Sequence, residues 1–181
     1  MMKHALTNSG WPRRAVVALV AVALAIGLTG CFASGDLGGQ TAAAAMREVK
    51  SIPGSAASSY VASDSSYSGF TKQNATTVHI NIEPDHHIQD PEALVDFLIR
   101  VAWSVNDARP NSNLMVVIDS DVPIDAVTAA RSAGWASAHA FANEPAAVFV
   151  KLSEAKKRLG DWPGKVPTVP DGVIVAATPA P

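Results

Sequence analysis

"DPEALVDFLIRVAWSV", residues 90–105, is followed after a polar connection by "LMVVID", residues 114–119, and these two stretches decide the fold. In the first stretch apolar side chains recur at helical spacing, which predicts an amphipathic helix. Asp90 is placed to cap this helix, and Pro91 suits its first position. The second stretch is a short continuous apolar run, which is typical of a buried central strand. The recurring apolar residues of the helix are Leu94, Phe97, Leu98, Val101 and Val105.

The preceding sequence predicts a helix and then a hairpin. Val78, Ile80 and Ile82 alternate with polar residues, so this strand has one apolar and one polar face. Ser68-Gly69 is a turn signal between the two strands. The expected segments are a helix over 41–54 that Pro53-Gly54 ends, strands within 55–63 and 75–84, and a turn-rich loop over 64–74.

The following sequence predicts two more helices, a second hairpin and a tail. Asp121 and Ser153 are the expected caps of the two helices, and Gly134 is the expected stop of the first. The proline-rich residues 161–181 are expected to be extended or disordered. The other expected segments are a helix over 122–133, strands within 136–142 and 146–152, and a helix over 153–160.

The resulting order, αββαβαββα, predicts an α/β (α+β) fold. Strand pairs at both ends and crossover helices between them favour a mixed sheet with helices mainly on one face. This is an open-faced sandwich, ferredoxin-like in layout. The chain has 181 residues, of which 48% are hydrophobic, so a single domain over residues 41–160 can bury a core.

The N-terminal residues have the organisation of an export signal. Lys3, Arg13 and Arg14 precede residues 15–28, which carry no charge. A basic region followed by an apolar run of this length is typical of a signal peptide and is short for a spanning helix. The alternative is an uncleaved signal anchor in which the following Cys31 has no role.

The apolar run ends in Leu28-Thr29-Gly30-Cys31, which resembles the lipobox of bacterial lipoproteins. The resemblance implies a diacylglyceryl thioether on Cys31 and cleavage by a signal peptidase between Gly30 and Cys31. Residues 1–30 would then be a lipoprotein signal peptide, and residues 31–40 a flexible tether. Two acyl chains on one residue satisfy the requirement for stable anchoring. The composition also resembles that of uncharacterised lipoproteins of high-GC Gram-positive bacteria. We therefore expect the protein to be located at the extracytoplasmic face of the cell membrane.

Net charge argues against a nucleic-acid partner. The formal charge is −2, and removal of the three basic residues of the signal peptide makes it −5. Nucleic-acid affinity comes largely from neutralised phosphates, which an acidic domain does not favour.

Cys31 is also the chain's single cysteine, so an exported domain would depend on its core without disulfides.

The segment "HINIEPDHHIQD", residues 79–90, gathers histidines and carboxylates and is the main candidate for chemistry. Such side chains are reasonable ligands for zinc, copper or nickel. Adjacent histidines in a strand point to opposite sides, so joint ligation requires a turn. The alternative is a polar connection whose histidines face water and whose Asp90 caps the helix. The predicted metal ligands are His79, Asp85, His86 and His87, within a group that also contains Glu83.

Two weaker candidates remain. Asp119 and Asp121 follow the strand at 114–119, where ligands of α/β folds tend to bind, so they could hold a cation or a sugar hydroxyl. Alternatively, Asp121 caps the next helix and Asp119 shapes the turn. The aromatic residues Trp103, Trp135 and Trp162 could form a carbohydrate platform, or they could complete the core.

The sequence contains no phosphate-binding glycine loop, GxSxG, HExxH or paired-cysteine pattern, so we expect a protein that is not an enzyme. The favoured function is a lipid-anchored envelope protein with a small non-catalytic interaction domain. Its expected partners are the membrane and another envelope protein. The alternative is a metal- or solute-binding lipoprotein that uses residues 79–90. A two-lobed solute receptor is excluded by size, and the residue spacing gives no support to a small hydrolase.

Overall fold

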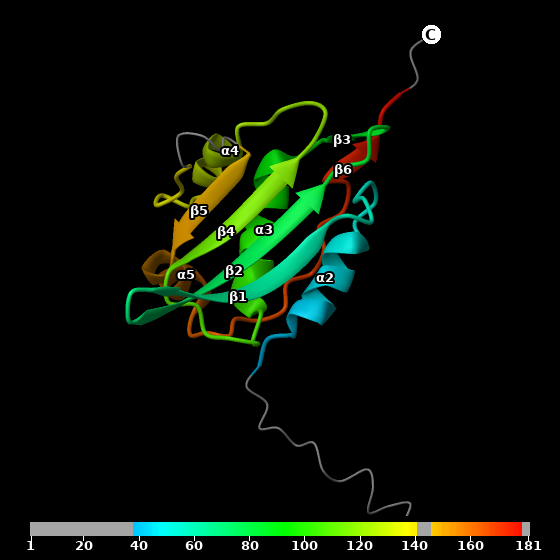
Figure 1. Ribbon diagram of the computed structural model, residues 1–181. Coiled ribbons are helices and arrows are strands. Elements are labelled where there is room, and N and C mark those ends of the chain that lie inside the picture. Colours follow the sequence, from blue (N-terminus) through cyan, green and yellow to red (C-terminus); the bar gives the residue numbers. More distant parts are fainter. Residues whose placement is uncertain (1–37, 141–145, 179–181) are drawn as a thin grey trace, which may run out of the picture. The chain divides into compact units, whose positions relative to one another are not determined.

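Four strands form a mixed sheet in the order β1-β2-β4-β5 (Figure 1). The computed structural model describes residues 38–140 and 146–178. The outer pairs of strands are antiparallel, whereas β2 and β4 are parallel. A parallel pair needs a crossover connection, and helix α3 lies within that connection. The strands are β1 (Tyr60–Ser68), β2 (Thr71–Asn81), β4 (Asn113–Asp119) and β5 (Ala147–Lys151).

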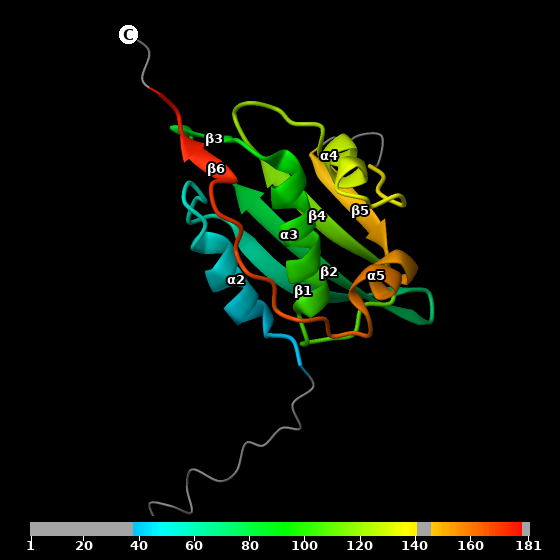
Figure 2. The ribbon, with the colours of Figure 1, turned by 180° about the vertical axis from the view of Figure 1, so that it is seen from behind.

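The helices of the described residues cover one face of this sheet, and the other face carries no helix (Figures 1 and 2). Helix α3 crosses the centre, α2 lies beside β1, and α4 and α5 lie near β5. The predicted open-faced α/β sandwich is therefore confirmed. The helices are α2 (Ala42–Lys50), α3 (Pro91–Ser104), α4 (Ala126–Ser132) and α5 (Leu152–Leu159).

The core lies between the sheet and the helices. Val78 and Ile80 on β2 and Leu94 and Leu98 on α3 are fully buried. Full burial of an aliphatic side chain of this kind stabilises the fold by about 1.5–3 kcal/mol. The predicted start of α3 is also confirmed, because the Asp90 carboxylate accepts a hydrogen bond of 2.9 Å from the Ala93 amide.

The first hairpin is longer than its sequence predicted. Residues 64–74, expected as a loop, continue the ladder of β1 and β2 until Ser68 pairs with Thr71. The turn lies where the Ser68-Gly69 signal placed it, and Gly69 adopts φ 61°, a left-handed conformation that glycine favours. Both strands are mostly polar here, with side chains that are exposed or half-buried, so there was no apolar alternation to indicate them.

A second, small sheet joins the middle of the chain to its end. Strand β3 (His86–Ile88) pairs antiparallel with β6 (Ile174–Ala176). Residues 161–181 were expected to be extended or disordered and to lie outside a domain that ends at residue 160, but their described part packs against that domain. Val173 and Ile174 are buried, and the Trp162 indole donates a hydrogen bond of 3.0 Å to the Val105 carbonyl. Prolines exclude a helix in this segment, but they do not prevent its burial.

Three local expectations in the second half need correction. Asp125, rather than Asp121, caps α4, because its carboxylate accepts from the Thr128 amide and hydroxyl. Helix α5 begins after Lys151 without a side-chain cap, so Ser153 does not have that role. The expected strand at 136–142 is reduced to a single bridge between His139 and Phe149, with 141 and 142 outside the described residues.

Glu154 on α5 holds the segment that follows α4. Its carboxylate accepts hydrogen bonds from the backbone amides of Ala136 and Ser137, and from the Ser137 hydroxyl. Partial burial raises the pKa of the Glu154 carboxyl, but these hydrogen bonds and the nearby Arg158 outweigh burial and hold the pKa below its ordinary value. The ionised carboxylate therefore stabilises this connection.

Candidate functional site

The loop after β2 is held to two neighbouring segments and is closed by a bond of its own. The Glu83 amide donates a hydrogen bond of 2.9 Å to the Gly54 carbonyl. The His86 amide donates a hydrogen bond of 2.9 Å to the Glu83 carbonyl, which closes a turn. The Asp85 carbonyl accepts a hydrogen bond of 2.6 Å from Ala177, just beyond β6. This backbone network fixes the positions of the side chains on residues 83–86.

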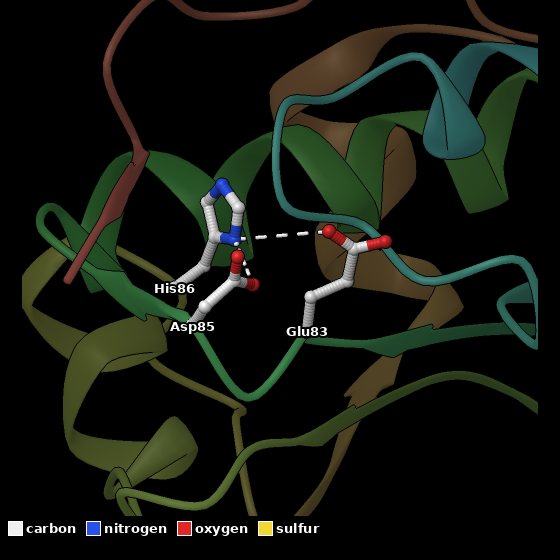
Figure 3. Close-up of side chains that lie close together, drawn as sticks. All are labelled: Glu83, Asp85 and His86. Atoms are coloured by element: carbon white, nitrogen blue, oxygen red, sulfur yellow. Dashed lines mark hydrogen bonds and ion pairs between the residues drawn. The ribbon is translucent and has the colours of Figure 1, made fainter.

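Glu83, Asp85 and His86 bring their side chains together on this loop. The His86 Nδ1 atom lies 2.8 Å from Asp85 Oδ1 and 3.7 Å from Glu83 Oε2. Figure 3 shows the imidazole edge facing both carboxylates. One ligand atom from each of the three residues lies within 4.8 Å of the other two. We call these three residues the 83–86 cluster.

The imidazole is the most enclosed member of the 83–86 cluster. Its side chain is 18% exposed, whereas that of Asp85 is 79% exposed. The ring packs against Gly54, where an added Cβ would lie 2.6 Å from the ring and 2.6 Å from Ile174. Gly54 also has φ 78°, so glycine is favoured there by both space and backbone conformation. The strand that contains His86 and the turn at Gly54 thus orient the ring.

One imidazole nitrogen and two carboxylates form a ligand set that suits a divalent metal. A metal ion bound here would lie between Nδ1 and the two carboxylates that it faces. The same geometry is also that of an ordinary surface ion pair, and exposed pairs contribute little to stability. The geometry of the 83–86 cluster therefore fits both a metal site and a polar turn.

The structure divides the predicted ligand set. Asp85 and His86 come together with Glu83, but His79 and His87 lie outside the cluster. His87 follows His86 in β3, where successive side chains point to opposite faces. His79 instead bonds Asp119, with 2.7 Å between Nε2 and Oδ2. The grouping of all four residues in one site is therefore not what the structure shows.

His79 belongs to the helix-free face of the sheet, which we call the open face. Its ring meets the ring of Tyr60 edge-on, at 5.0 Å between centroids. Tyr60 is 42% exposed, and the neighbouring Val117 on β4 is half-buried. Sequence reasoning did not pair His79 with Asp119, because the two residues are distant in the chain and meet only through the parallel register of β2 and β4.

The two weaker candidates also have clear positions. Asp119 pairs with His79, while Asp121 lies in the connection before α4 and does not cap that helix. Trp103 and Trp135 are 4% and 0% exposed, and Trp162 packs against the core. These aromatic rings therefore stabilise the fold and do not form an exposed carbohydrate platform.

Cys31 and Gly30, the predicted lipidation and cleavage residues, lie outside the described residues. Within residues 38–140 and 146–178, no helix combines the length and the hydropathy that a membrane span requires. Comparisons with protein-family models, with curated proteins and with solved structures found no match to this chain.

Proposed function

We propose that the protein is a lipid-anchored protein of the cell envelope, with a non-catalytic α/β interaction domain outside the cytoplasmic membrane. The observation that carries this proposal is the sequence Leu28-Thr29-Gly30-Cys31, directly after an uncharged run and behind Arg13 and Arg14. A basic region followed by an uncharged run is the order of an export signal, and the four residues that come next resemble a lipobox. Cys31 is then the first residue of the mature protein.

The open face supports an interaction role for the domain. It presents Tyr60, His79 and Val117 on neighbouring strands that no helix within residues 38–140 and 146–178 covers. Aromatic residues with both an apolar ring and a polar group are favoured at protein interfaces. A sheet face of this kind can bind a partner without any catalytic group.

The anchor is tested by the variant Cys31→Ser in the full-length protein. The native protein is expected to begin at Cys31 and to carry the mass of a diacylglyceryl group, while the variant stays uncut and without lipid. Ser34→Ala is the matched control and should be processed normally. Normal cleavage and membrane retention of Cys31→Ser would overturn the proposal.

The interaction role is tested by affinity capture of the anchored protein from membranes. A reproducible partner is expected for the native protein, and it should be lost in Tyr60→Thr and Val117→Thr, which alter the open face but keep β-forming residues. Val122→Thr, at an exposed position between β4 and α4, is the control. Capture that is unchanged in both open-face variants contradicts a role for this face.

A second function, divalent-metal binding, is favoured by the 83–86 cluster. Titration of the processed protein with zinc, nickel and copper should release heat and raise the melting temperature, since a ligand that binds the folded state stabilises it. His86→Ala should abolish both effects, and His87→Ala, one residue along β3, should retain them. No heat and no shift with any of the three metals would discard the metal site.

A further inference from the structure

The β1–β2 hairpin projects beyond the four-stranded sheet. β1 pairs with β2 along its whole length, but β4 pairs with β2 only from Thr76 onward. Residues 64–75 therefore form a two-stranded ribbon whose turn extends past the end of β4 (Figure 1). A ribbon in this position is not needed to cover the core.

Two aromatic side chains stand exposed at the end of this ribbon. Tyr67 is 73% exposed and Phe70 is 108% exposed, on either side of Ser68-Gly69. A Cβ added to Gly69 would meet no atom within 4 Å, so the turn itself projects into open space. Aromatic side chains carry large apolar areas that are normally buried. We call Tyr67–Phe70 the hairpin tip.

The ribbon is supported as far as Lys72, two residues from the hairpin tip. The Asn111 side chain accepts a hydrogen bond of 2.7 Å from the Asn74 amide and donates one of 2.8 Å to the Lys72 carbonyl. The Asn74 side chain in turn donates a hydrogen bond of 3.0 Å to the Arg109 carbonyl. These bonds hold the ribbon to the loop that follows α3, so the hairpin tip is presented on a fixed base.

The hairpin tip lies at the same end of the domain as its first described residues. The Gln40 amide donates to Ser104 at the end of α3, and the Asn106 amide donates to Gln40. The loop that supports the ribbon begins at this point, and Figures 1 and 2 show the hairpin turn at the end where the described chain begins. Cys31 precedes Gly38 by seven residues, which span at most about 25 Å.

We propose that the hairpin tip is a second membrane contact, in which Tyr67 and Phe70 enter the lipid interface beside the anchor; this inference rests on the proposed lipidation of Cys31. Tyrosine is favoured at the membrane–water interface, and a phenyl ring adds apolar area there. The anchor supplies a high local concentration, so a weak contact is sufficient. Asp64 and Lys72 balance in charge along the ribbon, so the contact is apolar rather than electrostatic.

The test uses the processed full chain reconstituted into vesicles of pure phosphatidylcholine or of phosphatidylcholine with phosphatidylglycerol. Acylated Cys31 has no free thiol, so Ser68→Cys adds a single site for a polarity-sensitive fluorophore. We expect a blue shift at this label, with quenching by spin-labelled lipid, in both compositions and with little dependence on salt. Val122→Cys, in the exposed connection after β4, should show neither effect.

The aromatic residues are tested by adding Tyr67→Ser and Phe70→Ser to the labelled protein. Loss of both rings should lower the membrane-inserted population of the hairpin tip by about tenfold or more, while the protein still floats with the vesicles. A protein that floats but gives no shift overturns the membrane contact alone. A protein that does not float overturns the lipid anchor, and the contact falls with it. A shift that occurs only in native membranes identifies a protein partner and overturns the lipid contact.

Discussion

The two faces of the central sheet use the same strands for opposite purposes. On β4, Val116 is 1% exposed against the helices, while the next residue, Val117, is half-buried on the open face. On β2, Val78 is fully buried, while its neighbour His79 reaches Asp119 and Tyr60. Because side chains alternate along a strand, one face can stabilise the fold while the other is available for recognition.

Side-chain exposure varies across the open face. At β5 the side chains on the open face are as buried as those that face the helices. Ala147 and Phe149 share the side of the sheet occupied by Val117 and Met115, yet both are buried. His139 pairs with Phe149 by two backbone hydrogen bonds and lies with its ring near that of Phe149. The available surface therefore lies toward β1 and β2, where Tyr60 and His79 are found.

The largest effect is expected from Leu98→Ala on the covered face. Removing this fully buried side chain leaves a cavity under the sheet and should lower the free energy of unfolding by about 2–5 kcal/mol. Urea unfolding measures the change. Val122→Ala, at a position 65% exposed, should change stability by no more than about 0.5 kcal/mol. Equal effects of the two variants would contradict the assignment of the core.

Glu154→Gln should weaken the segment after α4, which contains Ala136 and Ser137 and leads to His139 beside β5. Loss of charged hydrogen bonds to Ala136 and Ser137 is expected to cost about 1.5–3 kcal/mol near pH 7. The pKa of Glu154 is lowered from an ordinary value of 4.5, so its contribution is complete above that pH and is lost as pH falls through the folded-state pKa. The difference from native protein should therefore shrink below pH 4.5.

Urea unfolding of Glu154→Gln at several pH values checks this dependence. Glu92→Gln removes a carboxylate from an exposed position in the first turn of α3 and serves as the control. A cost for Glu154→Gln that is the same at pH 7 and at pH 3.5 would show that the ionised carboxylate is not the stabilising group.

The smallest effects come from one substitution made at two adjacent residues. Val116→Thr places a hydroxyl in the core and should cost about 1–3 kcal/mol, because the buried group has no partner. Val117→Thr makes the same chemical change on the open face and should stay within about 0.5 kcal/mol. The two melting temperatures compare the faces directly. If Val117→Thr is as damaging as Val116→Thr, the open face is part of the core.

Sequence reasoning succeeded where the determinants are local. Asp90 and Pro91 mark the start of α3, and the alternation in β2 assigns its two faces correctly. It failed where distant segments decide the outcome. β6 has only three residues and forms because β3 offers it a partner. Asp125 shows a missed local signal, since Thr128 stands three residues later and donates to it.

The candidate site shows the same limit. Asp85 and His86 are neighbours, so their meeting followed from the sequence, and Glu83 joins them through a short turn. His79 could not be assigned in this way, because its partner Asp119 comes from another strand and the choice depends on sheet register. The sequence therefore identified the correct segment but not the correct set of ligands.

The β3–β6 ladder has a consequence for biosynthesis. Its second strand, Ile174–Ala176, lies far downstream of β3 in the chain. A chain that is exported with its N-terminus first would deliver β3 well before β6, so the turn that carries His86 would remain without its partner strand until Ile174–Ala176 had also crossed the membrane. Closure of this small sheet would then be a late step, after the hairpin and α3 have already emerged.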